Sequence, residues 1–204
     1  MSDGINLRDI ERRAYLSYHE DGLLDIMIGF GIILSGLMLY AEMPWLVGAF
    51  VPVFTPIYIQ NKKKITVPRL GQVEFSNARN TKTKRTMFSL VIFNLLLFVA
   101  GLYAWFAMDM GGRPQWLIDI LSNYMLLFGA FGVIISMVVG FLSDLKRFHI
   151  YGLINLTIFT IINNYTDHPA FGLVSIGLIV VLNGFKLLFS FMSKYPVYGV
   201  DQDV

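Results

Sequence analysis

The chain has 204 residues, of which 55% are hydrophobic and only 15% are charged, against about 25% charged in ordinary soluble domains. Its apolar residues come in runs of the length that crosses a bilayer as a helix, about 20 residues. The absence of cysteine excludes disulfides, thiolate catalysis and cysteine-ligated metals. These features predict a single-domain, all-α integral membrane protein.

Residues 5–20 are expected to form an amphipathic helix, with Asn6 as its N-cap. Its apolar residues recur at spacings of three and four: Leu7, Ile10, Ala14 and Tyr18. Arg12 and Arg13 are placed to meet lipid phosphates if this helix lies at the membrane interface. A solvated helix packed on the protein's own cytoplasmic face is the alternative.

Six transmembrane helices in three hairpins are expected at residues 22–40, 45–60, 87–108, 116–142, 150–165 and 171–192. The helix at 45–60 is short, about 24 Å at ~1.5 Å per residue, and it contains Pro52 and Pro56. It is interpreted as either a kinked short span or a re-entrant segment, with spanning favoured. The segment at 116–142 is expected to be one long, tilted helix.

Residues 61–85 form a basic loop that holds eight Lys and Arg residues and one acid, Glu74. Within it, Lys64–Phe75 has a hairpin-like pattern, with Pro68 and Gly71 as turn residues. Because such loops are retained on the cytoplasmic side, the sequence predicts that both termini lie inside. Of the 16 Lys and Arg residues, only Arg113 then lies outside.

Small residues recur every four positions on two of the expected helices, as Gly31-x3-Ser35 and as Gly132-x3-Ser136-x3-Gly140. This spacing lets helix backbones approach closely in lipid. The expected contacts are within one chain, with a homodimer face as the alternative. Asn residues inside the expected spans, among them Asn155, are interpreted as interhelical hydrogen-bonding groups.

Two polar groups are candidates for chemistry. His19, Glu20, Asp21 and Asp25 cluster where the first span begins. Their carboxylates could hold a divalent cation, but acids at a helix N-terminus also complement the helix dipole, so no metal and no cofactor are predicted. Asp25, Asn183 and Lys186 are the second group, a possible intramembrane ion or proton site; Lys186 can instead extend to the inner interface.

Two stretches resemble uncharacterised prokaryotic multi-pass membrane proteins: residues 11–18 (ERRAYLSY) followed by Asp21–Asp25, and the pattern Pro68-Arg69-x-Gly71-x-Val73-x-Phe75 in the basic loop. The resemblance implies location in the plasma membrane of a prokaryote and no particular activity. The chain also lacks the phosphate-binding, H-E-x-x-H and G-x-S-x-G motifs of common enzyme classes.

The leading functional hypothesis is a non-enzymatic membrane protein that binds anionic lipid or a partner protein at its inner face. The residues expected to make contact are Arg12, Arg13, Lys62, Lys63, Lys64 and Arg69. A small transporter or channel using Asp25, Asn183 and Lys186 is the alternative, and a membrane enzyme built on residues 19–25 comes third. Nucleic-acid binding is not expected, because the loop offers no recognition helix and no aromatic side chain beyond Phe75.

Overall fold

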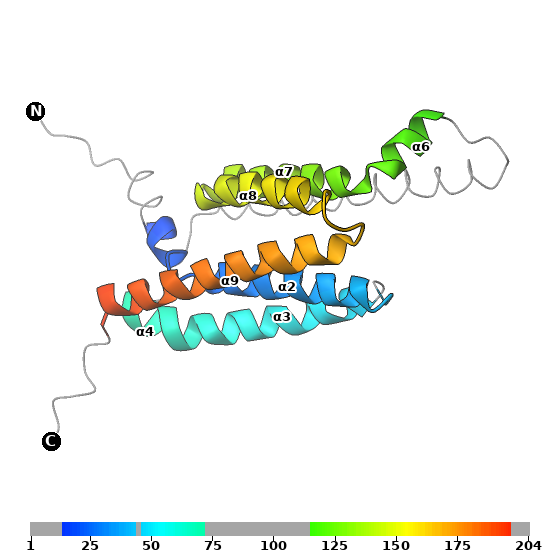
Figure 1. The fold of residues 1–204 in the computed structure, drawn as a ribbon. Coiled ribbons are helices and arrows are strands. Elements are labelled where there is room, and N and C mark those ends of the chain that lie inside the picture. Colours follow the sequence, from blue (N-terminus) through cyan, green and yellow to red (C-terminus); the bar gives the residue numbers. More distant parts are fainter. Residues whose placement is uncertain (1–13, 44–45, 72–114, 197–204) are drawn as a thin grey trace, which may run out of the picture. The chain divides into compact units, whose positions relative to one another are not determined.

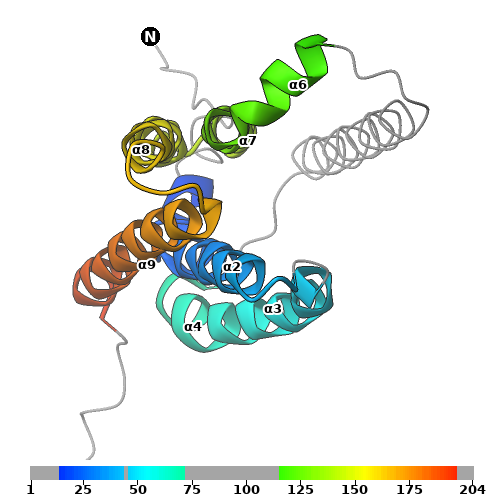
Figure 2. The same ribbon diagram turned by 45° about the vertical axis from the view of Figure 1, so that its right-hand side comes forward.

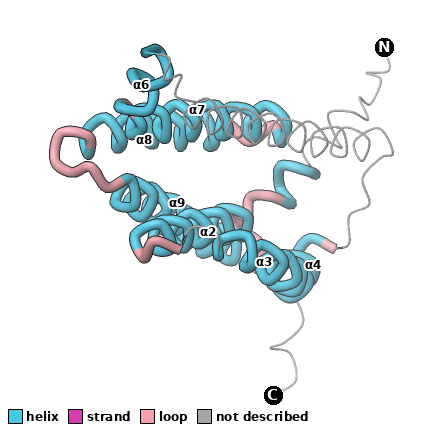
Figure 3. The backbone as a smooth tube through the Cα atoms, turned by 90° about the vertical axis from the view of Figure 1, so that its right-hand side faces the viewer, coloured by secondary structure: helices cyan, strands magenta, loops and turns pink. Residues whose placement is uncertain are grey.

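The computed structural model describes residues 14–43, 46–71 and 115–196, in which all regular structure is helical (Figures 1 and 3). The chain divides into two compact units. The first unit comprises Met1–Glu74 and Asn164–Val204, and the second comprises Phe75–Asn163. The predicted span at 87–108 lies outside the described residues, as do residues 5–13 and 72–85.

The first unit contains α2 (Leu23–Tyr40), α3 (Val47–Asn61) and α9 (Pro169–Lys194), which are close to the predicted helices. Residues 14–18 are also helical. Gly22 joins that short helix to α2 and has a left-handed backbone, with φ of 66°, a conformation that glycine adopts without steric cost. In this unit α2 lies between α9 and α3 (Figures 1 and 2).

The helix that starts at α3 is longer than predicted. It continues through a π-helical turn, η2 (Lys62–Thr66), into α4 (Val67–Leu70) and ends at Gly71. The three segments have 15, 5 and 4 residues, so the whole helix is about 36 Å long at ~1.5 Å per residue.

The predicted hairpin at Lys64–Phe75 is therefore wrong for residues 64–70, where the structure is helical. Pro68 lies in the first turn of α4, where a missing N–H costs a helix little. The apolar residues Ile65 and Val67 suggested a strand, but they fit equally well on a helix whose inward face carries Thr66.

The contact between α2 and α9 is made by small residues. They recur every seven positions on both helices: Gly22, Gly29 and Gly36 on one side, and Ala170, Gly177 and Gly184 on the other. A Cβ added to Gly29 would lie 2.9 Å from the Gly177 carbonyl oxygen, and a Cβ added to Gly177 would lie 2.9 Å from the Gly29 carbonyl oxygen. The two antiparallel backbones are thus in direct contact, an arrangement that larger side chains would prevent.

The predicted Gly31-x3-Ser35 pair does not take part in this contact. A Cβ added to Gly31 would meet only Phe54 of α3, at 4.0 Å, and the Ser35 hydroxyl donates to the Gly31 carbonyl of its own helix at 2.8 Å. The glycines that matter in α2 are on the other face.

In the second unit, the segment predicted as one helix at 116–142 is two helices. Helix α6 (Gln115–Ser122) and helix α7 (Tyr124–Ser143) are separated at Asn123, whose backbone is not helical. The Asn123 side chain donates to the Asp119 carbonyl at 2.9 Å. This bond offers the backbone an alternative to the helical hydrogen-bond pattern. The polar residue Asn123 therefore interrupts the helix that was predicted at 116–142.

Helix α8 (Arg147–Ile162) packs along α7 through the predicted small residues. Asn155 is buried, and its Nδ2 donates to the Gly129 carbonyl at 2.9 Å. Gly132 faces the Asn155 amide and Gly140 faces the His149 ring. Contacts within the chain therefore account for the small residues at positions 132, 136 and 140, and the interhelical role of Asn155 is confirmed.

Three of the described helices are long and apolar enough to cross a membrane: Leu23–Tyr40, Tyr124–Phe141 within α7, and Pro169–Lys194. Helix α8 is apolar but shorter. Together with the all-helical structure, these lengths are those of a helical membrane protein.

Replacing Gly29 by alanine should destabilise the first unit. The new methyl group would lie 2.8 Å from the Val181 backbone nitrogen and 2.9 Å from the Gly177 carbonyl oxygen, so the helices must separate, at a cost of about 1–3 kcal/mol. Gly31→Ala is the matched control, because its methyl group meets nothing closer than Phe54. It should be neutral or stabilising, since alanine favours a helix by about 0.5–1 kcal/mol over glycine. Unfolding followed by circular dichroism in detergent measures both; equal midpoints would contradict the close-packed contact.

Candidate functional site

A buried polar cluster lies where the chain enters α2. The Asp21 carboxylate is fully buried. Its Oδ1 accepts a hydrogen bond from the Leu23 N–H at 3.2 Å, and its Oδ2 accepts one from the Thr66 hydroxyl. Asp21 thus satisfies a donor at the start of α2, where helix N–H groups lack partners within the helix, and it connects that point to η2.

The cation that balances Asp21 is Lys62. The Lys62 Nζ lies 2.6 Å from Asp21 Oδ2, and its side chain is only 5% exposed. The ammonium also donates to the Tyr18 carbonyl and lies 4.0 Å from the centre of the Tyr18 ring. A buried ammonium needs this full set of partners, because transferring it out of water costs several kcal/mol.

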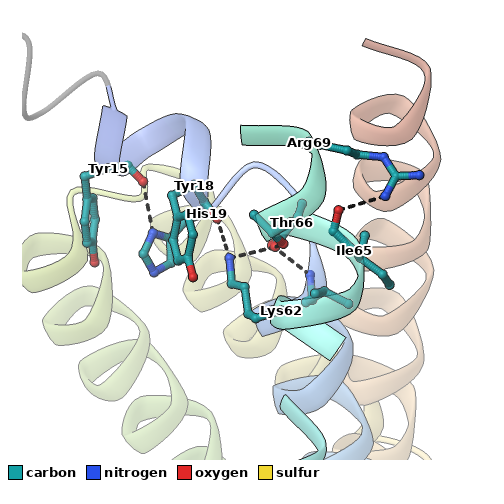
Figure 4. A network of polar contacts seen from close by, with 9 residues as sticks. Tyr15, Tyr18, His19, Lys62, Ile65, Thr66 and Arg69 are labelled. Carbon is teal, nitrogen blue, oxygen red and sulfur yellow. Dashed lines mark hydrogen bonds and ion pairs between the residues drawn. The ribbon is translucent and has the colours of Figure 1, made fainter. Parts of the chain in front are cut away.

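The register of η2 directs these side chains. Lys62 and Thr66 are four residues apart and both are buried, whereas Lys63 and Lys64, which lie between them, are exposed. Figure 4 shows Lys62 and Thr66 on one side of this helix, toward Tyr18. π-Helical turns occur frequently at functional sites. In this one, Lys62 is directed into the protein, and Lys63 and Lys64 are directed to the surface.

The expectation that Lys62 contacts lipid headgroups is corrected by its burial, because an ammonium enclosed by Asp21 and Tyr18 is not available at the surface. Lys63 and Lys64 are exposed, as that expectation requires. Arg69 is half-buried and donates from Nη1 to the Ile65 carbonyl at 2.7 Å. Arg12 and Arg13 lie outside the described residues.

The acidic and histidine residues at the start of α2 do not converge. The His19 ring is bonded through Nδ1 to the Tyr15 carbonyl at 2.9 Å, and Glu20 pairs with Lys194 at the surface at 2.9 Å. Within the described ranges, no three His, Asp or Glu side chains are grouped closely enough to hold a metal ion. The convergence at metal-ligand distances that the enzyme hypothesis predicted for residues 19–25 is therefore not found among these described side chains.

The members of the second candidate group differ in their burial. Asp25 is fully buried, where α2 meets α9 at Gly184. Lys186 lies on the exposed surface of α9, and Asn183 is half-buried.

Sequence reasoning did not identify Tyr18 or Thr66 as members of the cluster. Tyr18 contributes a backbone carbonyl and a ring face, and neither is visible in a residue pattern. The four-residue spacing of Lys62 and Thr66 was a usable signal, but it identifies a shared face only once the segment is known to be helical.

Comparisons with models of protein families, with curated proteins and with solved structures found no match to this chain. The function is therefore inferred from the residues of this chain alone.

Removing the Lys62 charge alone should strongly destabilise the protein. Lys62→Met leaves the Asp21 carboxylate buried without its cation, an arrangement that costs about 3–5 kcal/mol. Lys63→Met, one residue away and exposed, should change stability by no more than about 0.5 kcal/mol. Adding Asp21→Asn to Lys62→Met should recover part of the loss, because the cluster then contains no charged side chain. Denaturation in mixed micelles measures all three; equal effects of the two lysine variants would contradict the buried pair.

The Tyr18 hydroxyl should make stability fall at alkaline pH. Burial, and secondly the negative charge of Asp21, raises the pKa of Tyr18 above its ordinary value of about 10. The folded protein then holds the phenol proton more tightly than the unfolded chain does. This contribution is complete below pH ~10 and is lost as pH rises from there through the folded pKa. Tyr18→Phe keeps the ring beside Lys62 and removes the titration, so its unfolding midpoint should fall less than that of the wild type between pH 9 and pH 11.

Proposed function

We propose that the protein is a non-enzymatic, multi-pass membrane protein that binds anionic phospholipid headgroups through a basic inner face. The observation that carries the proposal is the exposure of Lys63 and Lys64 on η2, beyond the apolar part of α3. An ammonium held close to an anionic membrane surface contributes about 1 kcal/mol of attraction. Two adjacent lysines at the end of a long helix are suited to this role.

The distribution of charge along the sequence supports an inner location for this face. With six spans and both termini inside, 15 of the 16 Lys and Arg residues lie on the inner side. In this proposal the membrane is the plasma membrane of a prokaryote, whose inner leaflet contains anionic lipid. A partner protein or a second copy of the chain remains an alternative occupant of the same face.

The transporter alternative has less support. An internal Lys–Asp site needs both charges in one enclosed space, but Asp25 is buried between helices while Lys186 is exposed on α9. An exposed lysine near the end of an apolar helix is placed to extend toward the headgroups. Its position therefore fits an interfacial role better than an internal ion site.

Reversing the exposed charges should weaken lipid binding. Lys63→Glu/Lys64→Glu should lower the affinity for phosphatidylglycerol by about 30-fold or more, since at least ~2 kcal/mol of attraction is removed. Lys63→Arg/Lys64→Arg keeps both charges and should bind as the wild type does. Each purified protein is titrated with phosphatidylglycerol, with phosphatidylcholine as the reference lipid. Native mass spectrometry measures the amount of lipid bound.

Two outcomes would count against the proposal. Equal phosphatidylglycerol binding by the Glu and Arg variants would show that the exposed lysines are not the contacts. Retention of a second protein chain that is lost in the Glu variant, without any preference for anionic lipid, would assign the face to a protein partner.

A further inference from the structure

The groups around the Lys62 ammonium are those that surround a bound cation. Lys62 Nζ lies 2.6 Å from Asp21 Oδ2 and donates to the Tyr18 carbonyl oxygen. The centres of the Tyr18 and Tyr58 rings lie 4.0 Å and 5.8 Å from the same nitrogen. Carboxylate oxygens, backbone carbonyl oxygens and aromatic faces all attract cations in proteins. The Asp21 carboxylate, the Tyr18 carbonyl and the two rings thus form a cation cage that the protein fills with its own side chain (Figure 4).

The cage is suited to a single positive charge. Its one carboxylate, that of Asp21, is held by the Leu23 N–H and the Thr66 hydroxyl. Sites for divalent ions usually collect several carboxylates, and the described parts of the chain contain no group of three His, Asp or Glu side chains with metal-binding spacing. The carbonyl oxygen and the rings are neutral groups, and they suit K⁺ as well as an ammonium group because the two ions have the same charge and similar size. The ligand class is therefore a small monovalent cation.

The position of the cage allows the Lys62 side chain to leave it without unfolding the helix. Lys63 and Lys64, its neighbours in η2, are exposed, and Tyr18 and Tyr58 are half-buried, so the cage lies directly beneath the surface. A lysine ammonium is carried on a flexible four-carbon stem that can extend along apolar groups to water. Because Asp21 without a counter-charge is strongly unfavourable, outward movement of Lys62 requires another cation to enter.

We propose that the cation cage is a binding site for a small monovalent cation such as K⁺, in which Lys62 is the resident and exchangeable cation. Thr66 is a positioning residue, because its hydroxyl holds the Asp21 oxygen that faces the cation. Entry of K⁺ and outward movement of Lys62 are two parts of one exchange, so each favours the other. The inference goes beyond the proposed function and does not depend on it, because the cage involves no lipid contact.

Lys62→Ala empties the cage and leaves space for an added ion. In a detergent without anionic lipid, its unfolding midpoint should rise by about 2–4 °C when K⁺ is at roughly five times its dissociation constant. N-methyl-D-glucamine chloride keeps the ionic strength constant, and its cation is too large to enter. Methylammonium, which carries the missing ammonium group, should also stabilise this variant. Lys63→Ala, which removes an exposed lysine, should unfold at the same temperature in K⁺ and in N-methyl-D-glucamine.

Further substitutions in the Lys62→Ala protein show whether the ion enters this cage. Adding Asp21→Asn removes the carboxylate and should abolish the effect of K⁺. Adding Thr66→Val keeps the carboxylate but removes the hydroxyl that holds it, so K⁺ should bind about fivefold more weakly, the equivalent of one hydrogen bond. Adding Thr66→Ser in its place keeps the hydroxyl and should leave K⁺ binding unchanged.

The wild-type protein allows a test that needs no substitution. An acetylating reagent for amines should modify Lys62 more slowly than Lys63 and Lys64, which lie in the same peptide and serve as internal references. Replacing N-methyl-D-glucamine by K⁺ should increase the relative modification of Lys62 by about twofold when K⁺ equals the dissociation constant of the open cage, because K⁺ then holds the cage while Lys62 is outside. Mass spectrometry of peptide fragments distinguishes the three lysines.

Three results would overturn the inference. One is a Lys62→Ala protein that unfolds cooperatively at the same temperature in K⁺, methylammonium and N-methyl-D-glucamine. The second is equal modification of wild-type Lys62 in K⁺ and in N-methyl-D-glucamine, which decides the question if Lys62→Ala does not fold. The third is stabilisation of Lys62→Ala by Mg²⁺ and not by K⁺. None of them bears on lipid binding by Lys63 and Lys64, so failure of the cation site is distinguishable from failure of the proposed function.

Discussion

A carboxylate buried where a helix begins must be balanced, because an uncompensated charge in a low-dielectric site costs more free energy than the protein has to spare. Asp21 creates this requirement, and much of the first unit is arranged around it. Lys62 must point inward, η2 must present Lys62 and Thr66 on one face, and the chain before α2 must bring the Tyr18 carbonyl to the same point. The helix that starts at α3 therefore continues past its apolar part and reaches Leu70.

Close backbone contact is the second constraint. Lipid and apolar side chains are equally good surroundings for a transmembrane helix, so association depends on packing and on hydrogen bonds rather than on the hydrophobic effect. In the first unit, glycines every seven residues allow α2 and α9 to touch along their length. In the second unit, α7 and α8 combine glycines with the buried amide of Asn155. Both units thus use small residues, and the second adds a hydrogen bond from the Asn155 amide to the Gly129 carbonyl.

The run of three lysines at residues 62–64 shows how structure assigns different roles to identical residues. A loop would expose all three equally, and charge counting treats them as equivalent. A helix turns one of them inward and two of them outward, so one lies in a buried ion pair and two are exposed. The exposed pair at Glu20 and Lys194, by contrast, is half-solvated at both ends and contributes little to stability.

The sequence by itself determined the class of the protein and the approximate positions of α2, α3, α8 and α9, because long apolar runs and their polar ends are local signals. It also identified Asn155 and the small residues of α7, whose roles follow from residue type in an apolar setting. Only the tertiary structure decided that residues 64–70 are helical, that Asn123 interrupts a helix and that Gly29 rather than Gly31 faces α9. It alone could select Lys62 from three adjacent lysines, because burial depends on which partner the rest of the chain brings to that position. Asp21 and the Tyr18 carbonyl come from a segment more than forty residues before Lys62 and Thr66, and no local pattern records that the two segments meet.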